Sequence, residues 1–224
     1  MPKILTGSMA AIVVAAGGVF GFQFYMQHRI ASEVEAAFEQ IRATGAKASH
    51  GNVSFDPWSR TFTIADIAGE STAQPPFVVK IASVTAAGVG KKDGTRFSAD
   101  SIEVTGVEIG VGTPVQGLLR VIYRLPRMVV KDYSGPASVQ GLPASSSFLD
   151  LYRFGFQQLA SVTAASVTAP GLTGTIQFSA AMPDNGGEFS YSGLTMEGIK
   201  DGKIASSKLD GLAFTFAAQT AGKG

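Results

Sequence analysis

The sequence predicts an α+β fold in which an N-terminal transmembrane helix precedes an antiparallel β-sheet or meander covered by two or three helices. An uncharged apolar segment opens the chain, a helical apolar period follows it, and from residue 52 the period changes to two, with Gly-containing turns between the runs. We expect four regions: a membrane anchor over 1–29, a helix with β-hairpins over 30–133, a Gly/Pro/Ser loop over 134–147, and a helix with a three-stranded meander over 148–224.

The composition indicates a globular protein and excludes several kinds of partner and site. Of the 224 residues, 45% are hydrophobic, 16% are charged and 27 are glycine, which is typical of a turn-rich chain with a real core rather than of a disordered one. The net charge of +1, with no basic stripe, argues against nucleic acid as a partner. The absence of cysteine excludes disulfides, thiolate metal sites, a Cys nucleophile and a lipoprotein anchor.

The first element is a predicted transmembrane helix over Ile4–Met26, a segment without charged residues. Its length as a helix is roughly 34 Å, enough to cross a bilayer core with some tilt. A cleaved signal peptide ending near Val14-Ala15-Ala16 is the alternative, but the apolar run continues well beyond that point. Aromatic residues in the continuation are the candidates for a membrane-interface belt: Phe20, Phe22, Phe24 and Tyr25.

Two further expectations attach to this segment. Lys3 precedes it and Arg29 follows it, and because a tail of three residues is easily retained, we expect a single-pass inner-membrane protein with a cytoplasmic N-terminus and a periplasmic body. Gly17 and Gly21 have the GxxxG spacing that lets two helices pack closely, so another membrane protein or a second copy is a candidate partner. The high frequency of glycine in membrane helices explains the same spacing without any contact.

The next elements follow from the period of the apolar residues. An amphipathic helix is predicted over 30–46, because Ile30, Val34, Phe38 and Ile41 share one face. Alternation then predicts a hairpin over 53–67 with its turn at Asp56–Arg60. We expect Trp58 to fold back from this turn onto the sheet, with a membrane-interface contact as the alternative. The expected apolar face of the hairpin comprises Phe55, Trp58, Phe62 and Ile64.

Turn and cap residues divide the remaining chain. A second hairpin is predicted over 78–109, because Asp93-Gly94 is a favoured turn pair. Thr113-Pro114 resembles a helix start, so we expect a helix from Thr113 to Pro126 and then a strand over 127–133. After the loop we expect a further helix near 146–161 and three strands joined by tight turns at Asp184–Gly186 and Asp201-Gly202, namely 167–182, 187–199 and 203–217.

A short pattern recurs along these strands. Small residues lead to a glycine followed by a branched aliphatic residue at Gly88-Val89, Gly106-Val107 and Gly211-Leu212. The spacings between the copies vary, so the pattern does not give a strict solenoid period. Amphipathic strands that end in a glycine kink would look alike in any sheet.

The apolar leader, the amphipathic helix, the hairpin Val53–Ile67 and the strands ending in Gly-Val or Gly-Leu together resemble the start of AsmA-like envelope proteins. The resemblance covers roughly residues 1–110. It implies an inner-membrane anchor, a periplasmic body and a curved sheet with an apolar groove implicated in lipid handling. This chain is far shorter than the envelope-spanning members and its predicted helices interrupt its strands, which favours a small relative or a scaffold over a continuous conduit.

No catalytic, cofactor or metal site is expected. Only His28 and His50 are present, and no nucleophile elbow, Walker loop or dinucleotide fingerprint occurs. Asp184–Glu188 fits a tight turn better than a calcium loop. We therefore expect a binding or scaffold protein of the cell envelope that holds lipid or another apolar ligand, and not an enzyme. The alternative is an accessory subunit of an inner-membrane complex without a ligand.

Overall fold

A single antiparallel β-sheet dominates the fold, and α2 is the one helix described in full. The structure is a computed structural model that describes residues 27–43, 45–71, 76–92, 96–112, 120–136, 157, 160–178 and 186–217. In chain order the elements are α2 (Gln27–Ala43), β1 (Lys47–Ser49), β2 (Val53–Asp56), β3 (Thr61–Ser71), β4 (Phe77–Ala87), β5 (Gly90–Lys92), β6 (Arg96–Val111), β7 (Arg120–Pro136), β8 (Ala164–Gln177), β9 (Gly186–Lys200), β10 (Lys203–Lys208) and β11 (Gly211–Ala217).

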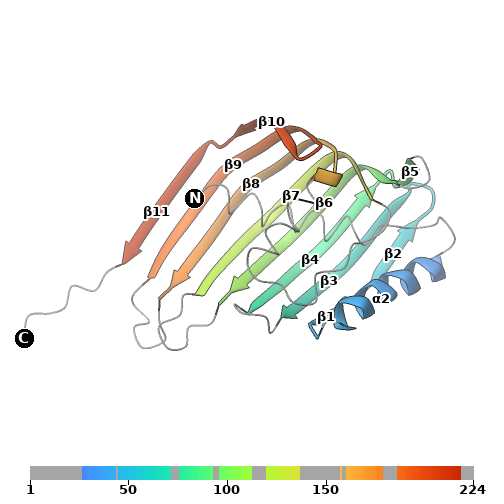
Figure 1. Ribbon diagram of the computed structural model, residues 1–224, viewed down its shortest axis with the longest axis horizontal. Coiled ribbons are helices and arrows are strands. Elements are labelled where there is room, and N and C mark those ends of the chain that lie inside the picture. Colours follow the sequence, from blue (N-terminus) through green and yellow to red (C-terminus); the bar gives the residue numbers. More distant parts are fainter. Residues whose placement is uncertain are drawn as a thin grey trace, which may run out of the picture.

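The long strands β3, β4, β6, β7, β8 and β9 lie in the sheet in the order in which they follow one another along the chain. The order is β1-β3-β4-β6-β7-β8-β9-β10, with β2 beside β3, β5 beside β6 and β11 beside β9. Figure 1 shows α2 at one end of the sheet, next to β1 and β2, and β11 at the opposite end. The predicted loop 134–147 is wrong at residues 134–136, because β7 extends to Pro136 and pairs there with β6. The strands before and after this region belong to one sheet, because β7 pairs with β8.

The first two predicted hairpins are confirmed where the structure describes them, whereas the predicted strand 203–217 is divided into β10 and β11, which both pair with β9. Phe55 of β2 lies opposite Phe62 of β3, and β4 pairs with β6 along most of its length. The turn between β9 and β10 has positive φ at both Asp201 (51°) and Gly202 (72°). This is the geometry of a type I′ turn, which matches the right-handed twist of the strands on either side.

The helix predicted from Thr113 to Pro126 is wrong from Arg120 onward, where β7 begins. Tyr123 pairs with Ile109 of β6 on one side and with Gly174 of β8 on the other, so both backbone edges of the segment are used. Pro126 lies where pairing with both neighbouring strands is interrupted, so its missing N–H removes no ladder hydrogen bond.

Two predicted elements cannot be compared with the structure. The span Ile4–Met26, with Gly17, Gly21 and the aromatic belt residues, lies outside the described residues, and so does most of the helix near 146–161. Within the described part of the chain, none of the helices has the length and apolar character needed to cross a membrane.

Buried side chains define an inner face of the sheet, and their spacing shows that the long strands are kinked. In β6, Ile102 and Val104 are two apart and the next buried residue, Val107, is three further on. At such a step two consecutive residues point away from the inner face. Residues with positive φ occur at these steps: Asp66, Gly88, Gly106, Asp132, Gly193 and Gly198.

The kinks align across the sheet in two rows because the strands are in register. The first row passes through Asp66, Ala82, Gly106, Pro126, Pro170, Gly193 and Asp210, or the residue beside each. The second row passes through Arg60, Gly88, Asp100, Asp132, Ala165, Gly198 and Ala205. The rows divide the inner face into three panels. We call the panel between the rows the middle panel, and the one that extends from the first row to the strand ends lowest in Figure 1 the lower panel.

The hydrophobic core occupies the middle panel. Its fully or almost fully buried side chains come from five consecutive strands: Phe62, Ile64, Val84, Ala86, Ile102, Val104, Met128, Val130, Val167 and Ala169. At one end of the sheet α2 adds Val34 and Phe38 to the same core. Each Val, Ile, Phe or Met side chain among them contributes on the order of 1.5–3 kcal/mol when removed from water, so this panel is the main source of stability.

Candidate functional site

The lower panel carries a continuous apolar surface from one edge of the sheet to the other. One cross-strand row passes through Ala48, Gly69, Val79, Ile109, Tyr123, Gly174, Phe189 and Phe214, each paired with the next. These residues come from eight different strands. With neighbouring strands roughly 4.8 Å apart, the row is about 34 Å long.

This surface is covered less completely than the middle panel, although Leu172 and Phe189 are buried. Val79, Ile109, Tyr123 and Ile176 are partly buried. Toward β11 the exposure rises, to 53% for Leu212, 49% for Phe214 and 61% for Phe216. Isolated exposed apolar residues are ordinary, but a contiguous apolar strip of this kind is typical of a binding surface.

No charged residue lies on the inner face of the lower panel among the described residues. The charges on the same strands lie on the outer face, where Arg124 Nε contacts Glu108 Oε2 at 2.9 Å and Lys47 Nζ contacts Glu70 Oε2 at 3.2 Å. These exposed ion pairs add little stability, about 0–1 kcal/mol each. Their positions show which face of the lower strands is turned to solvent.

A cluster of aromatic rings occupies the β11 end of the lower panel, and we call its five residues the aromatic cluster. Phe189 is at its centre, with ring centroids 5.5 Å from Tyr123, 5.9 Å from Tyr191 and 6.1 Å from Phe214. Phe216 extends the cluster, because its ring stacks on that of Phe214 at 6.4 Å. Such contacts favour apolar and aromatic ligands through dispersion and edge-to-face geometry.

Two glycines make room for these rings to lie across the strands. A Cβ atom at Gly174 would come within 1.9 Å of the Phe189 ring, and one at Gly187 within 2.7 Å of the Phe216 ring. Both distances are far below van der Waals contact, so any larger residue would displace the ring. The sequence therefore combines small residues on β8 and β9 with large aromatic residues beside them.

The polar groups of the aromatic cluster are limited to the two tyrosine hydroxyls. Burial, followed by the neighbouring Tyr191, raises the pKa of Tyr123 above its ordinary value, so the hydroxyl is neutral at physiological pH. A neutral hydroxyl can orient a ligand by a hydrogen bond. The cluster is thus suited to holding an apolar molecule.

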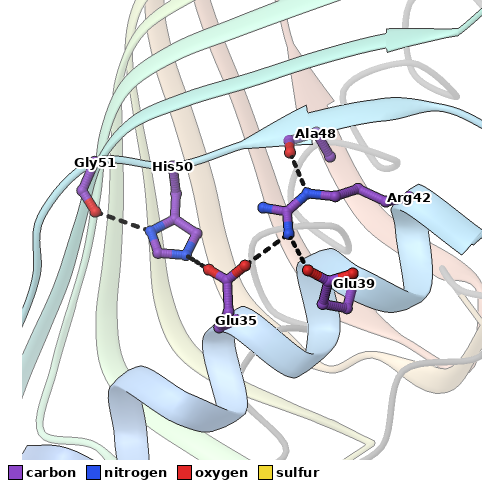
Figure 2. Close-up of polar contacts among 6 residues, drawn as sticks. All are labelled: Glu35, Glu39, Arg42, Ala48, His50 and Gly51. Carbon is purple, nitrogen blue, oxygen red and sulfur yellow. Dashed lines mark hydrogen bonds and ion pairs between the residues drawn. The ribbon is translucent and has the colours of Figure 1, made fainter.

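A polar network fastens α2 to the first strands at the opposite end of the sheet (Figure 2). Arg42 donates to Glu35 and Glu39, each at 2.6 Å, and to the Ala48 carbonyl at 2.7 Å. The His50 ring lies between the Glu35 carboxylate, at 3.0 Å, and the Gly51 carbonyl, at 2.8 Å. A neutral imidazole can donate to only one of these acceptors. The network explains how the helix is positioned, and each of its residues serves to hold the helix against the first strands.

The residues predicted for the apolar face of the first hairpin divide into two groups. Phe62 and Ile64 are buried, and Phe55 is partly buried against the core. The prediction that Trp58 folds back onto the sheet is wrong. Trp58 does not pack on the sheet and is 95% exposed. Pro57 and Trp58 form the tip of the turn between paired strands, and no other described segment lies over that tip.

The sequence interpretation predicted an apolar face but did not divide it into panels or single out the aromatic cluster. The signal that could have revealed it is the step from two to three in the apolar spacing, with Gly or Asp just before the next inner-face residue, as in Gly106-Val107 and Asp132-Tyr133. The recurring Gly-aliphatic pattern was part of this signal. Asp was overlooked because, among the residues with a Cβ, it is one of the few that tolerate positive φ.

Comparison with known proteins gives no further identification, since no family model, curated protein or solved structure matches the chain. The resemblance to AsmA-like proteins therefore stays a prediction.

Proposed function

We propose that this chain is a membrane-anchored binding protein of the cell envelope, related to AsmA-like proteins, that holds a lipid or another apolar ligand along the lower panel. In this proposal the segment Ile4–Met26 spans the inner membrane, the body is periplasmic, and the two kink rows bend the sheet so that its inner face is concave.

The observation that carries the proposal is the uncharged apolar strip that crosses eight strands and becomes exposed at its β11 end, where Phe214 is 49% exposed, whereas the side chains of the middle panel are buried. A strip about 34 Å long can accommodate an extended acyl chain. Each methylene group removed from water would contribute roughly 0.8 kcal/mol.

One feature favours the alternative, an accessory subunit without a ligand. Among the described residues β11 pairs only with β9, and the strand carries no charged residue. Edge strands that must avoid partners usually carry charge or proline. A docked protein would then cover the β11 end of the lower panel in place of lipid.

A matched pair of β11 variants tests the proposal. Phe214→Asp places a carboxylate on the inner face, whereas Thr215→Asp places the same group one residue away on the outer face. The full chain is purified, cross-linked to a photoreactive fatty acid, and the modified peptides are mapped by mass spectrometry. We expect adducts on β7, β9 and β11 that are lost in Phe214→Asp and retained in Thr215→Asp.

Adducts confined to residues 4–26, or equal labelling of the body in both variants, would rule out a ligand site on the lower panel. Circular dichroism of both variants establishes that the sheet is intact. An intact sheet without adducts in the wild-type body would favour the accessory subunit.

A further inference from the structure

The turn between β2 and β3 holds an almost fully exposed tryptophan on an ordered backbone. The Asp56 carboxylate accepts hydrogen bonds from the Trp58 N–H at 2.9 Å and from the Ser59 hydroxyl at 2.6 Å. These bonds, that of Ser59 first, hold the pKa of Asp56 below its ordinary value, so the carboxylate that orders the turn is ionised at neutral pH. Pro57 fixes one further backbone angle.

Exposing this indole to water is unfavourable, and nothing in the packing of the sheet requires it. Trp58 is 95% exposed, whereas the strands that flank its turn contribute Phe62 and Ile64 to the core. A tryptophan with an apolar ring and one N–H donor is suited to the boundary between water and lipid. Its place on an ordered turn means that little conformational entropy is lost when it binds.

The turn lies toward the end of the body where the predicted membrane span would enter. The segment from β1 to β2 runs antiparallel to α2, since Ala48 contacts Arg42 near the end of the helix and His50 contacts Glu35, two turns earlier. The chain from His50 to Asp56 therefore runs toward the first turn of α2. Figure 1 shows the β2–β3 turn at the same end of the molecule as the start of α2. In sequence, Gln27 follows directly on Ile4–Met26.

A basic residue accompanies the tryptophan. Arg60 follows it in the turn and is exposed, and the Arg60 carbonyl accepts a hydrogen bond from the Val89 N–H at 3.0 Å. Basic side chains near a bilayer are attracted to anionic headgroups, and this attraction favours a lipid surface as the partner.

We infer that the β2–β3 turn is a second membrane contact, in which Trp58 inserts into the interfacial region of the bilayer while Arg60 faces anionic headgroups. The inference rests on the membrane anchoring in the proposed function. It adds a fixed orientation of the sheet relative to the bilayer, with the α2 end closest to the membrane and the β11 end furthest from it.

The fluorescence of this protein tests the inference directly, because Trp58 is its single tryptophan. The full chain is reconstituted into phosphatidylcholine–phosphatidylglycerol vesicles, with brominated phospholipids whose bromines lie at a shallow or a deep position of the acyl chain. We expect a blue-shifted emission that is quenched more strongly by the shallow bromines than by the deep ones. Aqueous iodide should quench it only weakly.

A variant at the neighbouring basic residue tests the role of charge. Arg60 has a φ of 50°, a conformation that Asn tolerates well, so Arg60→Asn removes the charge without added backbone strain. We expect less bromine quenching for Arg60→Asn in anionic vesicles and no change in neutral ones. Equal quenching in anionic vesicles would overturn the role given to Arg60.

Flotation of the vesicles separates failure of the inference from failure of the proposed function. Protein that floats with the vesicles but whose emission is water-like and open to iodide keeps its anchor and refutes the second contact. Blue-shifted emission without bromine quenching refutes it as well and indicates a protein surface over Trp58. Protein that does not float refutes both.

Discussion

At the scale of single residues, the kinks of the sheet depend on positions that tolerate positive φ. Gly106 has a φ of 60°, and a Cβ atom there would lie 2.7 Å from the Cβ of Ala82 on the neighbouring strand. Gly198 and Ala205 repeat the arrangement at the same distance. Asp66 and Asp132 have positive φ without being glycine. At Gly106 and Gly198 the close approach of the strands therefore depends on the alanine of the neighbouring strand as well as on the glycine.

Gly106→Ala is expected to destabilise the protein. The left-handed backbone alone costs a residue with a Cβ atom about 1–2 kcal/mol, and the close approach to Ala82 adds to that cost. Thermal unfolding followed by circular dichroism should show a decrease in Tm of several degrees. Gly110→Ala on the same strand is the control, because its φ is not positive and its new Cβ would come no nearer than 4.0 Å to another group. Equal effects of the two substitutions would contradict the importance assigned to the kink.

At the scale of elements, α2 is held by two buried side chains and one polar network. Val34 and Phe38 are buried in the core, and the Phe38 ring meets the His50 ring edge-on at a centroid distance of 4.6 Å. Arg42, one turn later, bonds the carbonyl of Ala48 in β1. The helix thus closes the β1–β3 end of the sheet, while the β11 end has no comparable cover among the described residues.

Phe38→Ala is expected to loosen this closure. Loss of a buried phenylalanine costs about 3–5 kcal/mol, and among the described side chains of α2 only Val34 is similarly buried. Limited trypsin digestion should cleave the variant after Arg42 faster than the wild type. Glu39→Ala, on the exposed side of the same helix turn, removes only a surface ion pair worth about 0–1 kcal/mol. If both variants resist trypsin equally, α2 is held by something other than Phe38.

At the scale of the whole molecule, the sheet is built by adding each strand beside an earlier one. The longest strands, β6 and β7, lie in its interior, whereas β1 and β11 lie toward its ends. Free energies of local opening follow the number of neighbours and the buried area of each segment. Stability should therefore decrease from the middle of the sheet to both edges.

Amide hydrogen exchange of the full chain, read by mass spectrometry, should show this gradient. We expect the slowest exchange in β6 and β7 and the fastest strand exchange in β11, with β1 partly protected by α2. The positions of the central strands explain the order, since both of their backbone edges are paired. Protection of β11 equal to that of β6 would mean that a partner strand covers the edge of β11 that is unpaired among the described residues.

Much of the fold could be predicted where the signals are local. The helix over α2, the hairpin of β2 and β3 and the turn at Asp201-Gly202 follow from apolar period and turn chemistry within a few residues. Segment 120–126 could not be assigned locally, because Ile122, Tyr123 and Leu125 fit both a short helix and a strand. The long paired edges of β6 and β8 decide for the strand.

The sequence by itself predicted antiparallel hairpins and the apolar character of one face, since both depend on neighbours along the chain. Tertiary structure alone decided the pairing of β1 with β3 and of β11 with β9, the alignment of the kinks in rows, and the exposure of Trp58 and of the β11 end of the lower panel. The physical reason is that burial and kink alignment depend on register between strands far apart in sequence. An apolar residue such as Trp58 or Phe214 looks like a core residue until the strands around it show how far it is exposed.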